Sequence, residues 1–134
     1  MTKTSGGVTT KNIPVFVVLP PQTLLLDVAG PLEVLRYANQ QQNDIHFDCH
    51  YVASGETQST TIGLTLAGLE TLPDALPDNA MVLISGSSFI TLPGAGSESD
   101  IKRERRALAD WLRSTVRDDT VIISICSGAL IAAQ

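Results

Sequence analysis

The stretch that decides the fold is "VIISICSGALIAAQ", Val121 to Gln134. It begins as an apolar run typical of a buried strand and continues, after Cys126, as a small-residue segment typical of a helix. Residues 124–128, Ser-Ile-Cys-Ser-Gly, have the spacing of a nucleophile elbow, in which small neighbours let a strained turn lift the central side chain above a sheet. The alternative is that Cys126 is a small buried hydrophobic residue at a strand end.

The preceding sequence repeats this alternation of strand and helix. Buried or half-buried strands are predicted at 13–19 ("IPVFVVL"), 45–54 ("IHFDCHYVAS") and 81–85 ("MVLIS"), a weak hairpin at 55–68, and amphipathic helices at 31–43 and about 100–117. Pro31 is expected at the first position of its helix, where a missing N–H costs nothing. Strands alternating with helices predict a flavodoxin-like α/β fold, a parallel sheet with helices on both faces.

Length and charge limit what the chain can be. Its 134 residues, 43% of them hydrophobic, suit one domain, predicted at 13–134 after a flexible lead at 1–12 that resembles neither a signal peptide nor a membrane anchor. The net charge of -5 argues against direct binding to a nucleic acid backbone. No apolar run is long enough to span a bilayer, and two cysteines form no disulfide framework, so a cytoplasmic location without membrane contact is expected.

Three motifs follow predicted strands, at the sheet edge where parallel α/β proteins bind ligands. They are "LLLDVAGPLEVL" at 24–35, "SGS" at 85–87 and "ISICSGALIAA" at 123–133. Together they resemble the ThiJ/PfpI branch of the class I glutamine amidotransferase-like superfamily. The likeness is closest to the amino-terminal domains of AraC-type transcriptional regulators, and isocyanide hydratase-like enzymes share the D-x-x-G-P and C-[ST]-G signatures. The resemblance covers about residues 13–134.

The resemblance implies roles for six residues. Cys126 holds the nucleophile position, Asp27 the position of the acid that approaches its sulfur, and Glu33 is the second candidate for that acid. The N–H groups of Gly86, Ser87 and Ser127 would form an oxyanion pocket. From the residues alone, Asp27 can instead be a cap at the entry to the Pro31 helix, and Glu33 a first-turn carboxylate that complements the helix dipole.

Two departures from this family stand out. Ser87 replaces the second glycine of the usual P-G-G turn, which puts close backbone approach there in doubt. Members with a catalytic triad take a histidine from beyond the elbow helix, whereas this sequence ends at Gln134. His46 and His50 lie four positions apart on one strand, roughly 13 Å, which is too far for one shared metal ion. They are expected to be a solvated strand face, and neither a metal nor a cofactor is predicted.

Three functions follow from the resemblance. The first is a ligand-sensing and dimerisation domain of an AraC-type regulator, without established catalysis, that forms a homodimer, binds an unknown small molecule and meets DNA only through a C-terminal domain absent from this chain. The second is a cysteine-dependent hydrolase or hydratase, isocyanide hydratase-like or amidase-like. The third is a redox protein in which Cys126 cycles through sulfenic acid. The uncapped apolar helix at 127–134 predicts that further chain follows the elbow.

Overall fold

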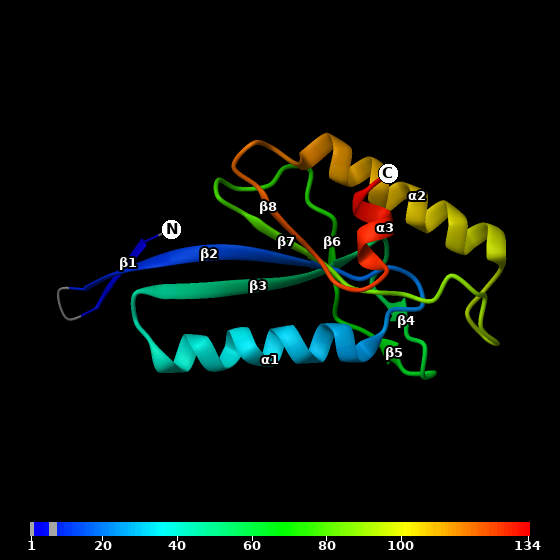
Figure 1. The fold of residues 1–134 in the computed structure, drawn as a ribbon, viewed down its shortest axis with the longest axis horizontal. Coiled ribbons are helices and arrows are strands. Elements are labelled where there is room, and N and C mark those ends of the chain that lie inside the picture. Colours follow the sequence, from blue (N-terminus) through cyan, green and yellow to red (C-terminus); the bar gives the residue numbers. More distant parts are fainter. Residues whose placement is uncertain (1, 6–7) are drawn as a thin grey trace.

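A computed structural model describes residues 2–5 and 8–134, and its centre is a parallel sheet (Figure 1). The strands are β2 (Val8–Val18), β3 (Ile45–Ala53), β6 (Glu70–Thr71), β7 (Met81–Ile84) and β8 (Val121–Ser124), in the order β6-β3-β2-β7-β8. β1 (Thr2–Ser5) pairs antiparallel with β2, and β4 (Gln58–Ser59) with β5 (Thr65–Leu66) forms a separate hairpin. The four longest parallel strands follow the flavodoxin-like order, which confirms the predicted fold class.

Helices cover both faces of the sheet, as Figure 1 shows. α1 (Leu25–Gln41) lies on one face, whereas α2 (Glu98–Thr115) and α3 (Gly128–Ala132) lie on the other. Each face has its own apolar cluster. The α1 side includes Val15, Val17, Leu19, Val28, Leu32 and Leu83, and the α2 side includes Phe16, Val18, Val82, Ile84, Leu108, Trp111, Leu112 and Ile131. Successive residues of β2 therefore point to opposite clusters, as expected for a strand buried on both sides.

The first long strand begins earlier than the sequence predicts. β2 starts at Val8, not at Ile13, and Lys11 and Asn12 already pair with Ile45 and His46 of β3. Residues 8–12 therefore belong to the sheet and not to a lead, because main-chain pairing does not need the apolar side chains on which the prediction relied. Residues 1, 6 and 7 of the expected lead lie outside the described residues.

The first helix also begins earlier than predicted. α1 starts at Leu25, and Pro31 lies inside it. The Asp27 N–H donates to the Leu24 carbonyl (3.0 Å), which closes a first turn ahead of the proline. Asp27 is thus a first-turn residue and not a cap near Pro31, and Glu33 lies mid-helix and not in the first turn.

The second long helix agrees with its predicted pattern. Ser97 caps α2 by accepting a hydrogen bond from the Asp100 N–H (3.1 Å), and Ile101, Leu108 and Leu112 are buried as expected. In residues 2–5 and 8–134, no helix is both long enough and apolar enough to cross a membrane.

One strand differs from the prediction in its burial. Val121, Ile122 and Ile123 of β8 are exposed although their sequence is typical of a buried strand. The reason is position, since β8 is the last strand of the sheet and pairs only with β7 in the part of the chain that the structure describes.

Candidate functional site

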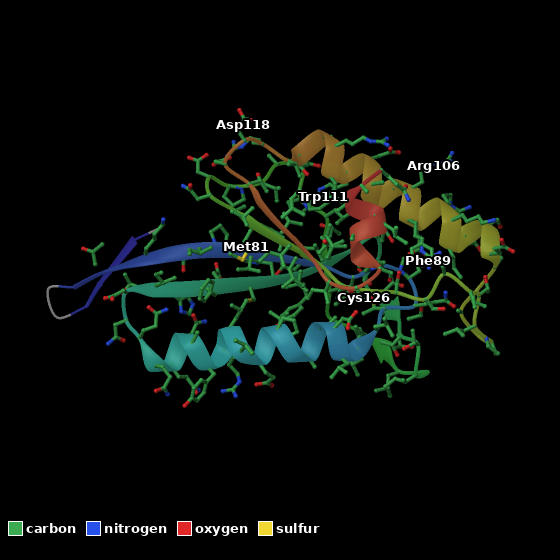
Figure 2. The ribbon with its side chains drawn as sticks, viewed as in Figure 1. Met81, Phe89, Arg106, Trp111, Asp118 and Cys126 are labelled. Carbon is green, nitrogen blue, oxygen red and sulfur yellow. The ribbon has the colours of Figure 1, made fainter. Side chains whose placement is uncertain are left out.

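Cys126 lies at the turn between β8 and α3, at the carboxyl edge of the sheet (Figure 2). Its side chain is exposed and its φ is 51°, a left-handed conformation that is uncommon for residues other than glycine. Gly128 explains how the turn fits against the sheet, because a Cβ at this position would overlap the carbonyl oxygens of Ile84 and Ser85. The small residues of the motif thus permit a tight and strained turn, as the sequence predicts.

Gly86 joins the first and last of the three motifs. A Cβ at Gly86 would overlap the Asp27 Oδ2 atom and would lie 3.0 Å from the Cys126 Cβ. Both atoms therefore lie within 3.0 Å of one point, so that no more than about 6 Å separates the carboxylate oxygen from the cysteine Cβ. The structure brings Asp27, Gly86 and Cys126 together, and the absence of a side chain at Gly86 makes room for this contact.

The Asp27 carboxyl group has an unusual environment. Its Oδ2 atom is buried and has no hydrogen-bond partner among the described residues. A buried oxygen without a partner is costly in a folded protein. This cost falls if a hydrogen-bond donor reaches the oxygen, so Asp27 is suited to bind a donor group at this place.

The three expected oxyanion donors are not equivalent. The Ser87 N–H donates to the Ser127 Oγ (2.9 Å), and this hydroxyl in turn donates to the Ser87 carbonyl (2.8 Å). The Ser87 N–H is therefore already occupied. Within the described part of the chain, the N–H groups of Gly86 and Ser127 make no hydrogen bond, so these two stay candidates for the expected pocket.

Other predicted candidates lie elsewhere. Glu33 is exposed on α1 and forms an ion pair with Arg36 (2.6 Å), so no contact connects it with Cys126. His46 pairs with Asn12 at the amino end of β3, the opposite end of the sheet from the site. Among residues 2–5 and 8–134, no cluster of histidine, cysteine and acidic side chains could hold a metal ion.

His50 belongs to a separate cluster. Its two ring nitrogens lie 3.2 Å from carboxylate oxygens of Asp48 and Glu70, and its ring stacks on Phe16. Partial burial opposes protonation of His50, but the hydrogen bonds with Glu70 and Asp48 outweigh it and raise the pKa of the imidazole.

The second cysteine provides a contrast with the first. Cys49 is half-buried on β3, packed against the α1-side cluster, as the alternation of this strand predicts. Burial, together with the charge of Asp48, raises the pKa of its thiol. Both effects disfavour the reactive thiolate of Cys49.

Sequence reasoning missed the residues that hold the site in place. Gln22 to Leu24 run beside the turn that follows β7, and the Leu24 N–H donates to the Gly86 carbonyl (2.9 Å). Gln22 is fully buried with a φ of 57°. The only signal in the sequence is a polar pair, Gln22-Thr23, between two prolines and a leucine run. Such a pair is ordinary in a loop, so the pattern alone does not indicate a buried side chain.

No protein-family model matches the sequence, and no curated protein matches it either. Solved structures with the same fold do exist. A protein from Vibrio parahaemolyticus assigned as a transcriptional regulator aligns with a TM-score of 0.63 at 21% identity over 92% of this chain and 61% of its own. A ThiJ/PfpI family protein from Pseudomonas syringae aligns with a TM-score of 0.57 at 16% identity, over 91% of this chain and 45% of its own. An AraC family transcriptional regulator from Pseudomonas putida aligns with a TM-score of 0.54 at 16% identity, over 91% of this chain and 59% of its own.

The chain thus spans about 45 to 61% of the length of these three solved chains. At such identities the likeness concerns the fold alone. It confirms the fold that the sequence resemblance implies. This chain has the α/β fold seen in these ThiJ/PfpI and AraC family structures.

Proposed function

We propose that this chain is a ligand-sensing domain of an AraC-type transcriptional regulator and that its ligand binds at Cys126. The observation that carries the proposal is the meeting of an exposed cysteine in a strained turn, a buried unpartnered Asp27 oxygen and two unoccupied N–H donors. These groups suit a small polar molecule with an electrophilic carbon. Similarity to two regulators supports the assignment to this class of protein.

The positions of the two histidines support a single reaction, as distinct from turnover, for these 134 residues by themselves. Hydrolysis through a cysteine needs a group that activates water after the thiolate has reacted, most often a histidine. The two histidines of the sequence lie on β3, away from Cys126. In this proposal Asp27 is the acidic partner of Cys126 among the described residues, so a reaction of this 134-residue chain at Cys126 should stop after a single event.

Dimerisation belongs to the same proposal, and so does DNA binding through a separate domain. The acidic charge of this chain is compatible with a division of labour in which another domain contacts DNA. The exposed outer face of α1, with Leu26, Val34 and Tyr37, supports a homodimer because apolar side chains gather there on a helix that already buries its other face.

The proposal is tested with p-nitrophenyl acetate, which reports attack on a carbonyl carbon by releasing p-nitrophenolate. We expect a rapid burst of about one equivalent per chain without steady turnover, and no burst for Cys126→Ser. Cys49→Ser is the matched control and should retain the burst. Sustained turnover that depends on Cys126 would favour the hydrolase alternative, whereas an unchanged burst in Cys126→Ser would remove Cys126 from the site.

A further inference from the structure

The turn after β7 is held at Ser87 by the Ser127 hydroxyl and at residues 88–92 by the buried side chain of Gln22. Gln22 donates through its amide nitrogen to the carbonyls of Ser88 (2.9 Å) and Ile90 (3.1 Å), and its amide oxygen accepts the Leu92 N–H (2.6 Å). The Gln22 carbonyl also accepts the Ser88 N–H (3.1 Å). These bonds hold residues 88–92 from one position in the chain.

The backbone at Gln22 indicates that its side chain is needed. Its φ of 57° is a conformation that glycine would adopt without strain. Glycine would lose all three amide hydrogen bonds, and the amide is completely buried with each of its polar atoms paired. A fully satisfied amide in this place can fix the geometry of the turn around it.

The segment that contains Gln22, residues 22–24, also contacts the candidate site. The Leu24 N–H binds the Gly86 carbonyl, and Leu24 is the N-cap residue of α1, three positions before Asp27. The outer part of the turn has one further support, the Ser88 hydroxyl, which donates to the Ile90 carbonyl (2.9 Å), while the side chains of Phe89 and Ile90 are exposed. Figure 2 shows Phe89 on this turn, below α2. Arg105 of α2 adds two contacts: it donates to the Ser88 carbonyl, and its guanidinium group lies 4.2 Å from the centre of the Phe89 ring.

We propose that Gln22 is a positioning residue for the Cys126 site, which keeps the Gly86 N–H in place for the oxygen of an acyl compound bound there. This inference rests on the proposed function of Cys126. When the thiolate attacks an ester carbonyl, an S–C bond forms and the π electron pair moves onto oxygen, which then accepts hydrogen bonds from preorganised N–H donors. The pair returns as the alkoxide or phenolate leaves with the electrons of the C–O bond.

The test compares two reactions of the same thiol. Acylation by p-nitrophenyl acetate develops an oxyanion, whereas alkylation by iodoacetamide displaces iodide at carbon without one. Both need the thiolate, so the ratio of their rate constants cancels any change in thiolate population. Removal of an oxyanion donor costs on the order of 10²-fold to 10³-fold, and we expect Gln22→Ala, which displaces a donor, to lower the ratio at least about tenfold.

Asn39→Ala is the matched control. The Asn39 amide also binds the main chain twice, to the N–H (2.8 Å) and carbonyl (2.9 Å) of Phe47, but it joins α1 to β3 away from the turn. Its loss should leave the ratio unchanged. If Gln22→Ala does not fold, Gln22→Glu carries the test: the carboxylate still accepts the Leu92 N–H but repels the Ser88 and Ile90 carbonyls. Because burial raises the pKa of a carboxyl group, the ratio should fall as the pH rises through the pKa of this Glu and recover when the group is protonated.

The outcomes separate this inference from the function on which it rests. A ratio that stays at the wild-type value in folded Gln22 variants would show that Gln22 is only structural, while the Cys126 site stands. Equal falls in the control would likewise assign the effect to general loosening and overturn the inference. Acylation that persists in Cys126→Ser would reject the proposed site itself, and the role of Gln22 with it.

Discussion

At the scale of single residues, the environments of the two cysteines predict very different reactivity. Cys126 is exposed at a helix start, whereas Cys49 is half-buried and its pKa is raised. We expect iodoacetamide at neutral pH to label Cys126 first, by at least about tenfold, since the thiolate is the reactive form. Mass spectrometry of the competitive reaction checks this. Equal labelling, or preference for Cys49, would contradict the role of Cys126.

In the same assay, Asp27→Ala tests the carboxyl partner. In the proposed site the buried Asp27 oxygen, which has no partner among the described residues, interacts with Cys126 and assists its reaction. We therefore expect labelling of Cys126 in Asp27→Ala to slow by up to about tenfold. Glu33→Ala is the comparison variant, because Glu33 pairs with Arg36 and should not affect the sulfur. Faster labelling in Asp27→Ala would mean that Asp27 opposes the thiolate.

Sequence reasoning succeeded for the local geometry at Cys126, whereas the role of this residue stays a prediction. The S-x-C-x-G pattern predicted a strained turn, and Cys126 has the positive φ that such a turn needs. It failed for Ser87 because a hydrogen bond between side chain and backbone, from Ser127 in a motif 40 positions away, occupies the expected donor. Contacts of this kind depend on how two loops meet, which no local pattern encodes.

At the scale of elements, His50 links the short strand β6 to the sheet. Asp48 and Glu70 accept from its two ring nitrogens, which requires the doubly protonated imidazolium. Because the folded-state pKa of His50 is raised, the stabilisation is complete below the ordinary value of about 6.5 and disappears as the pH rises through the folded value. We expect the melting temperature to fall from pH 6 towards pH 8.

His50→Gln should remove most of this slope in thermal unfolding followed by circular dichroism. His46→Gln is the matched control, since His46 lies on the same strand and faces no such pair of carboxylates in the described structure. A slope that survives in His50→Gln and vanishes in His46→Gln would contradict the argument.

The boundaries of the elements show where prediction from sequence reached its limit. Proline at a first helical position is a sound expectation, yet α1 begins at Leu25 and accommodates Pro31 within it. The burial of Val28 and Leu32 on the α1-side cluster outweighs the hydrogen bond that Pro31 cannot make. Tertiary packing thus determines where α1 begins, which local propensity predicted too late in the sequence. The sequence analysis therefore placed Asp27 before the helix, whereas it lies in the first turn of α1.

At the scale of the whole molecule, the parallel sheet was predictable and the exposed surfaces were not. Alternating strands and helices imply a parallel sheet and bring the three motifs to one edge. Whether an apolar strand is covered depends on its neighbours in space. Val121 to Ile123 form an edge, and the solved chains of the same fold are longer than this one.

The last prediction concerns assembly through α1. Leu26, Val34 and Tyr37 are 80%, 67% and 58% exposed, although the opposite side of the helix is buried. Their positions at i, i+8 and i+11 place them on one stripe, which two copies can share about a twofold axis, while Glu33 and Arg36 beside it offer charges of both signs to a partner. We expect sedimentation equilibrium to show a dimer for the wild type.

Val34→Asp should convert that dimer to a monomer. We expect the dissociation constant of the dimer to rise at least about a hundredfold, because a carboxylate would be desolvated at the centre of the interface. Ile122→Asp is the control, since it places the same charge on the exposed edge strand β8 and should leave an α1 dimer intact. If Ile122→Asp dissociates the dimer and Val34→Asp does not, the two copies meet edge to edge through β8. A monomeric wild type at all concentrations would exclude both surfaces and remove dimerisation from the proposed function.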